Sequence, residues 1–542
     1  MKDLPALKYL LYLVLGIVLG MLAKLSVLIV CPLLCLLFLT VIFLKPAERS
    51  GLVFVFIIVL CGMMRVSIYN ENYNLSYDVL EGRDSLMIHV IKQKTNPFHI
   101  ESYIVRTHIS DIKIKGTLYA KKGMPVLVPG ASYLVSDIKW KPISGDRNPY
   151  VFNYLNYAKV KGLSHSFQIQ KNAMIKKRDI IHPLRFAAHR LKSDLSVRYL
   201  AVLGIEKGSL VNGLLFGLKS EIPVCIAGLF RQLGVSHLLA VSGLHVGLIM
   251  LIVYQILLTL GITRIPRTLC VGIFLIFYCF ITGGAASVVR SSLMTVMLMF
   301  APVFKRKYRA LNAVAASAVI LLLINPYSLR DLGFQFSYSA VFGILIAYPR
   351  IRETLGQKKY NKLTGYIIDM LSVSLSAALF TSPVALFYFN SLQLASMLLN
   401  IIVIPLTFCV MISAILLLPG LFLHSFVSNL FLHALDLSLD VFRWVLRLAS
   451  RSEIWTMSVS SYWKPLIFLL VLICLILICT RDKRIIKLGL MLCLTGCSFW
   501  FYMNTRPEVV HPVLKKGDML LFRKGRQALV VNTGSRYYNS ND

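Results

Sequence analysis

Long apolar runs alternate with short basic or glycine- and proline-containing joints along most of the chain. A helix needs about 20 apolar residues to cross the hydrocarbon core of a bilayer, so this pattern predicts membrane spans. The spans predicted near the amino terminus cover residues 6–22, 25–44 and 52–68. Those of the centre cover 238–260, 269–282, 287–303, 310–324, 332–348, 367–389 and 394–418, and two later ones cover 466–479 and 485–501. The sequence therefore predicts an α-helical polytopic membrane protein of about ten to twelve spans.

Between residues 69 and 180 the pattern changes, because polar and apolar residues alternate there, as in residues 86–90 and 112–119. Glycine and proline punctuate this stretch at Gly123, Pro125, Pro129 and Gly130. A period of two with such punctuation predicts short strands. We expect an inserted extramembrane domain built as a small antiparallel β-barrel of the OB type, although a β-sandwich would give the same pattern.

These patterns of apolar and polar residues divide the chain into six segments. They are amino-terminal transmembrane helices (1–68), the OB-like β domain (69–180), amphipathic or connector helices (181–234), the membrane core (235–450), carboxy-terminal transmembrane helices (451–503) and a final segment (504–542). The basic joint at residues 45–49 predicts a cytoplasmic loop, which puts the β domain on the external side. Residues 182–203 carry basic side chains among apolar ones and fit either a helix on the membrane surface or an ordinary connector.

The net charge of the chain suggests what kind of molecule it binds. The chain has 58 Lys and Arg against 24 Asp and Glu, a net charge of +34, although only 15% of its residues are charged and its mean hydropathy is +0.71. Orientation of loops alone does not normally require so large an excess, so a polyanion is a plausible partner, beside lipid headgroups. Most of the 11 cysteines lie in apolar runs and none pairs with histidines at zinc-site spacing, so we predict no metal and no cofactor.

Polar residues interrupt the apolar run that begins at Ser236. His237, Ser242, Gly243 and His245 all fall inside what the pattern predicts as one helix. Imidazoles in a membrane helix usually mark a functional site, and the small residues permit close approach of a neighbouring helix. Simple helix packing is the alternative.

A second run, residues 282–292, holds a glycine pair followed by Arg290. The pair Gly283-Gly284 is expected to break a helix and to place Arg290 one turn into the next helix. A guanidinium remains charged and matches the geometry of a phosphate, so a backbone phosphate could bind here. A salt bridge, or a side chain reaching the interface, is the alternative.

A third run, residues 325–340, ends one predicted span and opens another. Pro326 should stop the first helix and Asp331 should favour the start of the next. Gln335 and Ser337 follow in its first turns, where polar side chains are expected to face either a water-filled path or another helix.

Together these runs resemble a known family. The strings HLLAVSGLHVG from His237, TGGAASVVRSSLM from Thr282, LLLINPYSLRDLGFQFSYSAVFGI from Leu321 and SPVALFYFNSLQLASMLLNIIVIPL from Ser382 resemble, in the same order, signatures of the ComEC family of competence proteins. NPYVFNYLNYAKVKG from Asn148 resembles the end of that family's OB-like domain. The resemblance implies a channel that takes single-stranded DNA, delivered by an outer DNA receptor, through the bacterial inner membrane.

The resemblance also bears on catalysis. Many members continue into a metallo-β-lactamase-like nuclease domain, of which only the opening hairpin is resembled here, at residues 515–521 and 528–534. Asn532 stands where the family usually has Asp, and no H-x-H-x-D-H string follows. We therefore expect no nuclease site and no enzyme activity, with either a truncated chain or a separate nuclease partner. Without a G-x-x-x-x-G-K-[ST] string, the motor must be a separate cytoplasmic ATPase.

Two groups of residues are candidates for contact with DNA. The first, expected to line or shape the membrane path, comprises His237, Ser242, Gly243, His245, Arg290, Asp331, Gln335 and Ser337. The second, expected to bind a strand at the external domain by charge and base stacking, comprises Lys113, Lys115, Tyr119, Lys121 and Lys122. Two rival functions remain open: an intramembrane hydrolase using Ser242 and His245, and a secondary transporter of a small anion, which should show inverted repeats.

Overall fold

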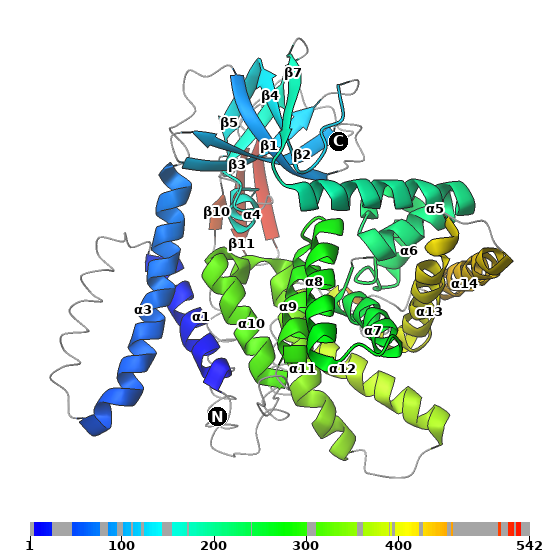
Figure 1. Ribbon diagram of the computed structural model, residues 1–542. Coiled ribbons are helices and arrows are strands. Elements are labelled where there is room, and N and C mark those ends of the chain that lie inside the picture. The colour runs from blue at the N-terminus through cyan, green and yellow to red at the C-terminus, as the bar shows by residue number, and fades with distance from the viewer. Residues whose placement is uncertain are drawn as a thin grey trace.

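The structure, a computed structural model, is mostly helical, with one sheet standing at one end of the helices (Figure 1). It describes residues 5–23, 46–75, 85–94, 101–109, 112–120, 124–143, 154–170, 173–239, 241–300, 310–354, 361–389, 391–392, 396–421, 426–452, 457–458, 508–510, 519–524 and 527–532. The spans expected at 25–44, 466–479 and 485–501 lie outside these residues.

Long apolar helices make up the body of the molecule. They are α1 (Pro5–Ala23), α3 (Pro46–Leu75), α5 (Pro183–Phe216), α7 (Gly243–Thr259), α8 (Arg264–Ile281), α9 (Ala286–Phe300), α10 (Ala310–Ile324), α11 (Leu332–Thr354), α12 (Lys362–Phe389), α13 (Ser396–Leu417) and α14 (Phe426–Ala449). Among the described residues, seven helices are long and apolar enough to cross a membrane: α1, α3 over Phe54–Asn74, α5, α8, α11, α12 and α13. The shorter helices α7, α9 and α10 are apolar as well.

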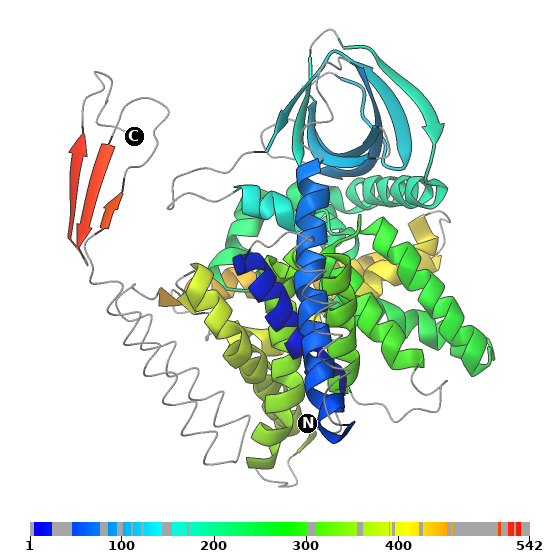
Figure 2. The ribbon, with the colours of Figure 1, turned by 90° about the vertical axis from the view of Figure 1, so that its left-hand side faces the viewer.

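A seven-stranded sheet forms in the stretch where the alternating pattern predicted strands. Its strands are β1 (Ser85–Lys94), β2 (Glu101–Ile109), β3 (Ile112–Ala120), β4 (Ala131–Ser136), β5 (Ile138–Pro142), β6 (His165–Ile169) and β7 (Ile175–Ile180), in the order β5-β6-β3-β2-β1-β4-β7. It curls around an apolar core that includes Ile88, Val105, Leu118 and Phe167 (Figure 2).

The sheet is mixed, so the expectation of a purely antiparallel one was wrong. Helix α4 (Tyr154–Lys161) carries the chain back from β5, and β6 then runs parallel to β3 while all other neighbours are antiparallel. Gly116 is required at this parallel pair, because a Cβ there would lie 2.4 Å from the carbonyl oxygen of His165. The crossover through α4 is the physical reason for the parallel pair.

Helix α4 also attaches the sheet to the helices beneath it. The Tyr69 hydroxyl of α3 donates to the carbonyl of Lys159 at 2.6 Å, and the Tyr73 hydroxyl donates to the carbonyl of Leu163 at 2.7 Å. The Asn325 amide, between α10 and the short helix η2 (Pro326–Arg330), donates to the carbonyl of Val160 at 2.8 Å. Side chains from two separate parts of the helical body therefore hold one short segment of the sheet domain.

The sequence predicted a helix over residues 182–203, and the first half of α5 ends there, at a break that turns α5 into a helical hairpin. Gly204 has φ +75° and ψ 174°, a conformation that glycine adopts and other residues avoid. The two halves fold back on one another, so that the Asn212 amide donates to Ser196 Oγ at 2.7 Å. A buried polar pair thus joins the two halves of the hairpin.

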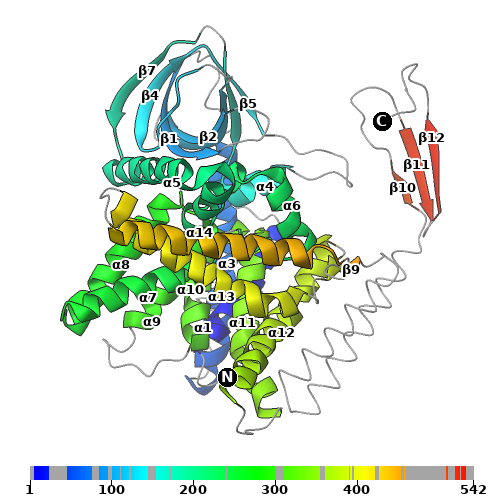
Figure 3. The same cartoon turned by 90° about the vertical axis from the view of Figure 1, so that its right-hand side faces the viewer.

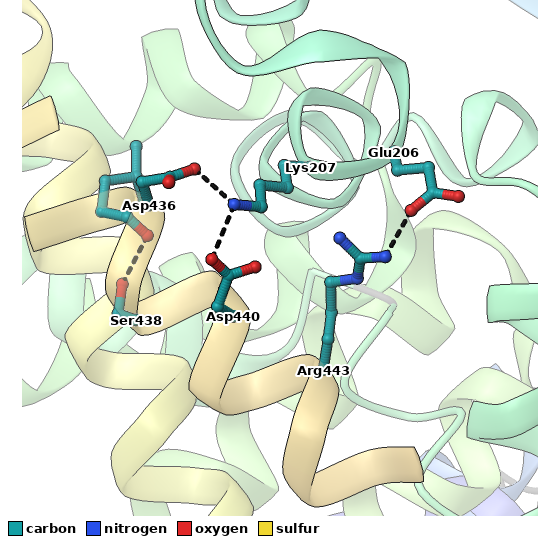
Figure 4. A network of polar contacts seen from close by, with 7 residues as sticks. Glu206, Lys207, Asp436, Ser438, Asp440 and Arg443 are labelled. Atoms are coloured by element: carbon teal, nitrogen blue, oxygen red, sulfur yellow. Dashed lines mark hydrogen bonds and ion pairs between the residues drawn. The ribbon is translucent and has the colours of Figure 1, made fainter. Parts of the chain in front are cut away.

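Ion pairs tie this hairpin to α14, which runs crosswise beneath it (Figure 3). Lys207 Nζ lies 2.6 Å from Asp436 Oδ1 and 2.9 Å from Asp440 Oδ2, and Arg443 pairs with Glu206 (Figure 4). A separate three-stranded antiparallel sheet near the carboxy terminus contains β10 (Glu508–Val510), β11 (Met519–Lys524) and β12 (Gln527–Asn532). Strands β11 and β12 form the hairpin expected there.

Candidate functional site

Helices α7, α9 and α11 begin beside one another, on the side of the helical body that meets the sheet. Ser287 Oγ of α9 donates to the carbonyl of Val241, just before α7, at 2.6 Å. A Cβ built on Gly333, in the first turn of α11, would lie 3.8 Å from an Arg290 nitrogen of α9. Three helix amino termini therefore meet, and their peptide dipoles make this place favourable for negative charge.

The start of α7 differs from the expectation. Ser242 is the N-cap residue with an extended backbone, so His237 lies in the preceding turn and only Gly243 and His245 belong to the helix. The backbone N–H of Ser242 donates to His245 Nδ1 at 3.4 Å. A helix beginning here needs acceptors for its first N–H groups, and the imidazole supplies one, which explains the late start.

Ser242 and His245 do not form a nucleophile–base pair in the described residues. Nδ1 of His245 is occupied by a backbone N–H, whereas Ser242 Oγ and His245 Nε2 are buried without a hydrogen-bond partner among those residues. Activation of a serine requires a hydrogen bond from its hydroxyl to the base. The geometry therefore gives the hydrolase alternative no support.

Arg290 is buried in α9, with a relative exposure of 4%. The glycine pair ends α8 as expected, both residues having positive φ, and α9 begins at Ala286, which puts Arg290 one turn in. Its Nε has no hydrogen-bond partner among the described residues. A buried guanidinium is costly unless an anion compensates it, so the position calls for negative charge nearby.

Asp331 supplies part of that charge. Its Oδ1 accepts from the backbone N–H of Gly333 at 3.0 Å, which caps the start of α11, and its Oδ2 lies 2.7 Å from Lys161 Nζ at the end of α4. A Cβ built on Gly333 would lie 3.4 Å from Asp331 Oδ1 and 3.8 Å from Arg290 Nη2, so these two groups border the same small space. The Asp331 carboxylate thus lies near the buried Arg290, caps the start of α11 and pairs with Lys161 of the sheet domain.

Gln335 and Ser337 follow in the first turns of α11. The Gln335 amide donates to the carbonyl of Leu329 at 2.9 Å, so it stabilises the turn that precedes the helix. Ser337, in the second turn of α11, is half-buried. Pro326 opens η2 directly after α10 ends at Ile324, as its position predicted.

The candidates of the external domain divide into three groups. Lys113 is exposed, whereas Lys115 donates to the carbonyl of Lys161 at 2.8 Å and Tyr119 is half-buried against α4. Burial, together with a hydrogen bond and the nearby charge of Tyr154, raises the pKa of Tyr119 to about 12. Lys121 and Lys122 lie outside the described residues.

Sequence reasoning missed Lys161 and Gly333. A carboxylate beside a membrane span normally has a cationic partner, and Lys161 lies in the string from Asn148 that resembles the family's domain end, so these two signals together could have pointed to it. Nothing in the sequence pattern singles out Gly333. Within the part of the chain that the structure describes, no three His, Cys, Asp or Glu side chains lie together as metal ligands.

Comparison with known proteins gives a consistent picture. The family model described as "Competence protein" matches residues 214–483, which include α7, α9 and α11. ComE operon protein 3 of Bacillus subtilis is 28% identical over 360 residues, covering 63% of this chain and 44% of that protein. Recombination protein 2 of Haemophilus influenzae is 26% identical over 212 residues, covering 37% of this chain and 27% of that protein.

A further relative is described only as the uncharacterized protein YcaI of Escherichia coli, which is 23% identical over 38% of this chain and 28% of its own length. The chain matches less than half the length of each of these three relatives. No solved structure matches the chain.

Proposed function

We propose that this chain is a ComEC-family competence protein and that it forms the path along which a single strand of DNA crosses the bacterial inner membrane during natural transformation. We place it in that membrane as a multi-pass protein with the sheet, an OB-like domain, on the external side. An outer DNA receptor delivers the strand and a separate ATPase drives it.

One observation carries the proposal: the meeting of three helix amino termini around buried polar groups. Arg290 Nε, Ser242 Oγ and His245 Nε2 are all buried and lack hydrogen-bond partners among the described residues. Groups of this kind are expensive among apolar helices and are tolerated where they border a polar ligand or water. A nucleic-acid backbone offers repeated phosphates, which suit both the guanidinium and the positive helix ends.

The charge of the chain supports the same proposal. A net charge of +34 attracts a polyanion, and Lys113 adds an exposed cation on the sheet. Phosphate contacts of this kind are independent of base sequence, as uptake of any DNA requires.

Transformation frequency tests the membrane path. Cells carrying Arg290→Ala or His245→Ala should yield far fewer transformants than wild type at equal amounts of membrane-inserted protein. Arg447→Ala removes an exposed cation on α14 and serves as the matched control, which should transform normally. Normal uptake by both path variants at wild-type protein level would refute the path.

Thiol labelling tests whether the site is accessible to water. In a chain whose native cysteines are replaced, a cysteine at Ser242 or Gln335 should react with a membrane-impermeant thiol reagent. Ser317→Cys is the control, because Ser317 is fully buried between α10 and Tyr338 and should stay unlabelled. If Ser242→Cys and Ser317→Cys are equally unreactive, the site is dry and the path lies elsewhere.

A further inference from the structure

A second group of cations lies above the site just described, where the sheet meets the helices. Lys92 comes from β1, Arg106 from β2 and Arg185 from the first turn of α5, and all three are partly exposed. Lys92 contacts the turn between α8 and α9 that contains Gly283 and Gly284, Arg185 lies over Phe280 at the end of α8, and Arg106 lies close to Arg185. The cluster therefore combines residues that are far apart in the sequence and belong to both halves of the molecule.

Backbone hydrogen bonds fix this arrangement. The N–H of Gly130 donates to the carbonyl of Val90 at 2.9 Å, and the carbonyl of Gly130 accepts from the N–H groups of Ile181 and His182 at 3.0 Å and 3.1 Å. The start of α5 is thereby held against the end of β1. A Cβ on Gly130 would lie 2.7 Å from the nitrogen of Phe186, so no larger residue fits this joint.

The cations then meet the glycine turn. A Cβ on Gly283 would lie 3.1 Å from Lys92 Cε, and the Arg185 guanidinium lies 5.9 Å from the centre of the Phe280 ring in α8. Gly283 and Gly284 have φ values of +65° and +66°, which bring bare backbone to the surface beside the lysine. Helix α9 starts two residues later and leads to Arg290.

The two arginines of this cluster carry like charges that lie close together. Arg106 and Arg185 lie close enough to repel each other, and Arg106 is the cross-strand neighbour of Lys115. Burial lowers the pKa of His182, and the charges of Arg185 and Arg106 lower it further. Among the described residues, neither arginine has an ion pair with a carboxylate. Like charges held together by the fold favour binding of an anion.

We propose that Lys92, Arg106 and Arg185 form a phosphate-binding collar over the Gly283-Gly284 turn, which takes successive phosphodiesters of single-stranded DNA and passes them toward Arg290. This inference rests on the proposed function and deepens it by naming where the strand enters the helical body. The first turn of α9 joins the collar to Arg290, so the sugar–phosphate backbone of one extended DNA strand can contact both. Anionic lipid headgroups share the phosphate chemistry and are the alternative occupant.

The test measures binding of fluorescein-labelled dT30 to the purified full chain in phosphatidylcholine nanodiscs over a range of salt concentrations. The variant carries Arg106→Gln and Arg185→Gln. The matched control carries Lys139→Gln and Lys141→Gln, which remove two exposed cations from the edge strand β5, separated from β2 by β6 and β3. A third chain with Arg106→Lys and Arg185→Lys keeps the charge and reports on folding.

Each phosphate contact with a single strand contributes about 0.7 to the slope of log affinity against log salt. Loss of two contacts should lower that slope by about 1.4 and raise the Kd near physiological salt about tenfold. The β5 control and the lysine chain should keep a slope close to that of wild type.

Three other outcomes separate the possible failures. If wild type binds dT30 and the glutamine variant binds it equally well, the collar is wrong while the proposed function stands. If that variant instead loses phosphatidylglycerol seen on wild type by native mass spectrometry, with dT30 binding unchanged, the cluster is a lipid site and the collar is also wrong. If wild type does not bind dT30, the proposed function fails together with the collar.

Discussion

Asp331 joins the extramembrane domain to the helical body, and removing its charge should disturb the molecule more than removing its lysine partner. Asp331→Asn leaves an amide oxygen that can still accept the N–H of Gly333, because Asn is as good an N-cap as Asp. It therefore removes the charge and keeps the cap. Lys161→Met removes the cation and keeps most of the side-chain stem.

The magnitudes follow from burial. Lys161 is 34% exposed and Asp331 19%, so their ion pair is partly screened and Lys161→Met should lower the free energy of unfolding by about 1 kcal/mol. Asp331→Asn also leaves Arg290, only 4% exposed, without its nearby carboxylate. Arg290 and Asp331 are neighbours rather than an ion pair among the described residues, so the loss of this charge beside a buried cation should lower the free energy of unfolding further, by about 1–3 kcal/mol. Asp331→Ala should add about 1 kcal/mol for the lost cap.

The double variant gives the sharpest comparison. When Asp331 is replaced by Asn, Lys161 no longer has a carboxylate partner, so adding Lys161→Met should lower the free energy of unfolding little further. The loss in the double variant should therefore be smaller than the sum of the two single losses by about 1 kcal/mol. Thermal unfolding midpoints of the detergent-solubilised chains should fall in the order wild type, Lys161→Met, Asp331→Asn, Asp331→Ala. If Lys161→Met lowers the midpoint as much as Asp331→Asn does, Asp331 does not compensate Arg290.

Two further predictions concern the glycine turn and the α5 hairpin. Gly283→Ala and Gly284→Ala should each destabilise the chain by about 1–2 kcal/mol, because both positions are left-handed. Only the Cβ of Gly283→Ala would displace the Lys92 side chain, so only that variant should also weaken binding of dT30. If both variants weaken dT30 binding equally, the contact between Gly283 and Lys92 does not contribute to binding. Lys207→Met should lower stability by about 1 kcal/mol at low salt and by much less in 1 M NaCl, since its two carboxylate partners are about half exposed. A loss that persists unchanged in high salt would show that packing of the Lys207 stem matters more than its charge.

The sequence predicted the helix ends and strands that depend on local backbone preferences. The glycine pair, Pro326 and the alternation of the β domain act through local backbone preferences, and the structure has the expected break after α8, the expected end of α10 and the expected strands. Asp331 caps α11, as its place at the start of an apolar run indicated. These features depend on a few neighbouring residues, which is why a sequence reveals them.

Features that depend on distant partners were not predictable in this way. The start of α7 at Gly243 is set by an imidazole that reaches back to the N–H of Ser242, although the apolar pattern continues upstream. The hairpin of α5 depends on Gly204 and on the pairing of Asn212 with Ser196, which no periodicity encodes. Whether the candidate path and collar residues touch DNA stays a prediction.

The two attachments of the sheet suggest how a strand could pass from it to the helices without a moving joint. On one side, three side chains of the helical body bind backbone carbonyls of α4 and the residues just after it, and on the other, the start of α5 is bound to Gly130. A sheet held at two separated places cannot rotate freely about either of them. Both attachments also flank charged contacts, Lys161 with Asp331 on one side and Lys92 with the glycine turn on the other. Lys92, Arg185, the glycine turn and Arg290 should therefore keep a fixed spacing.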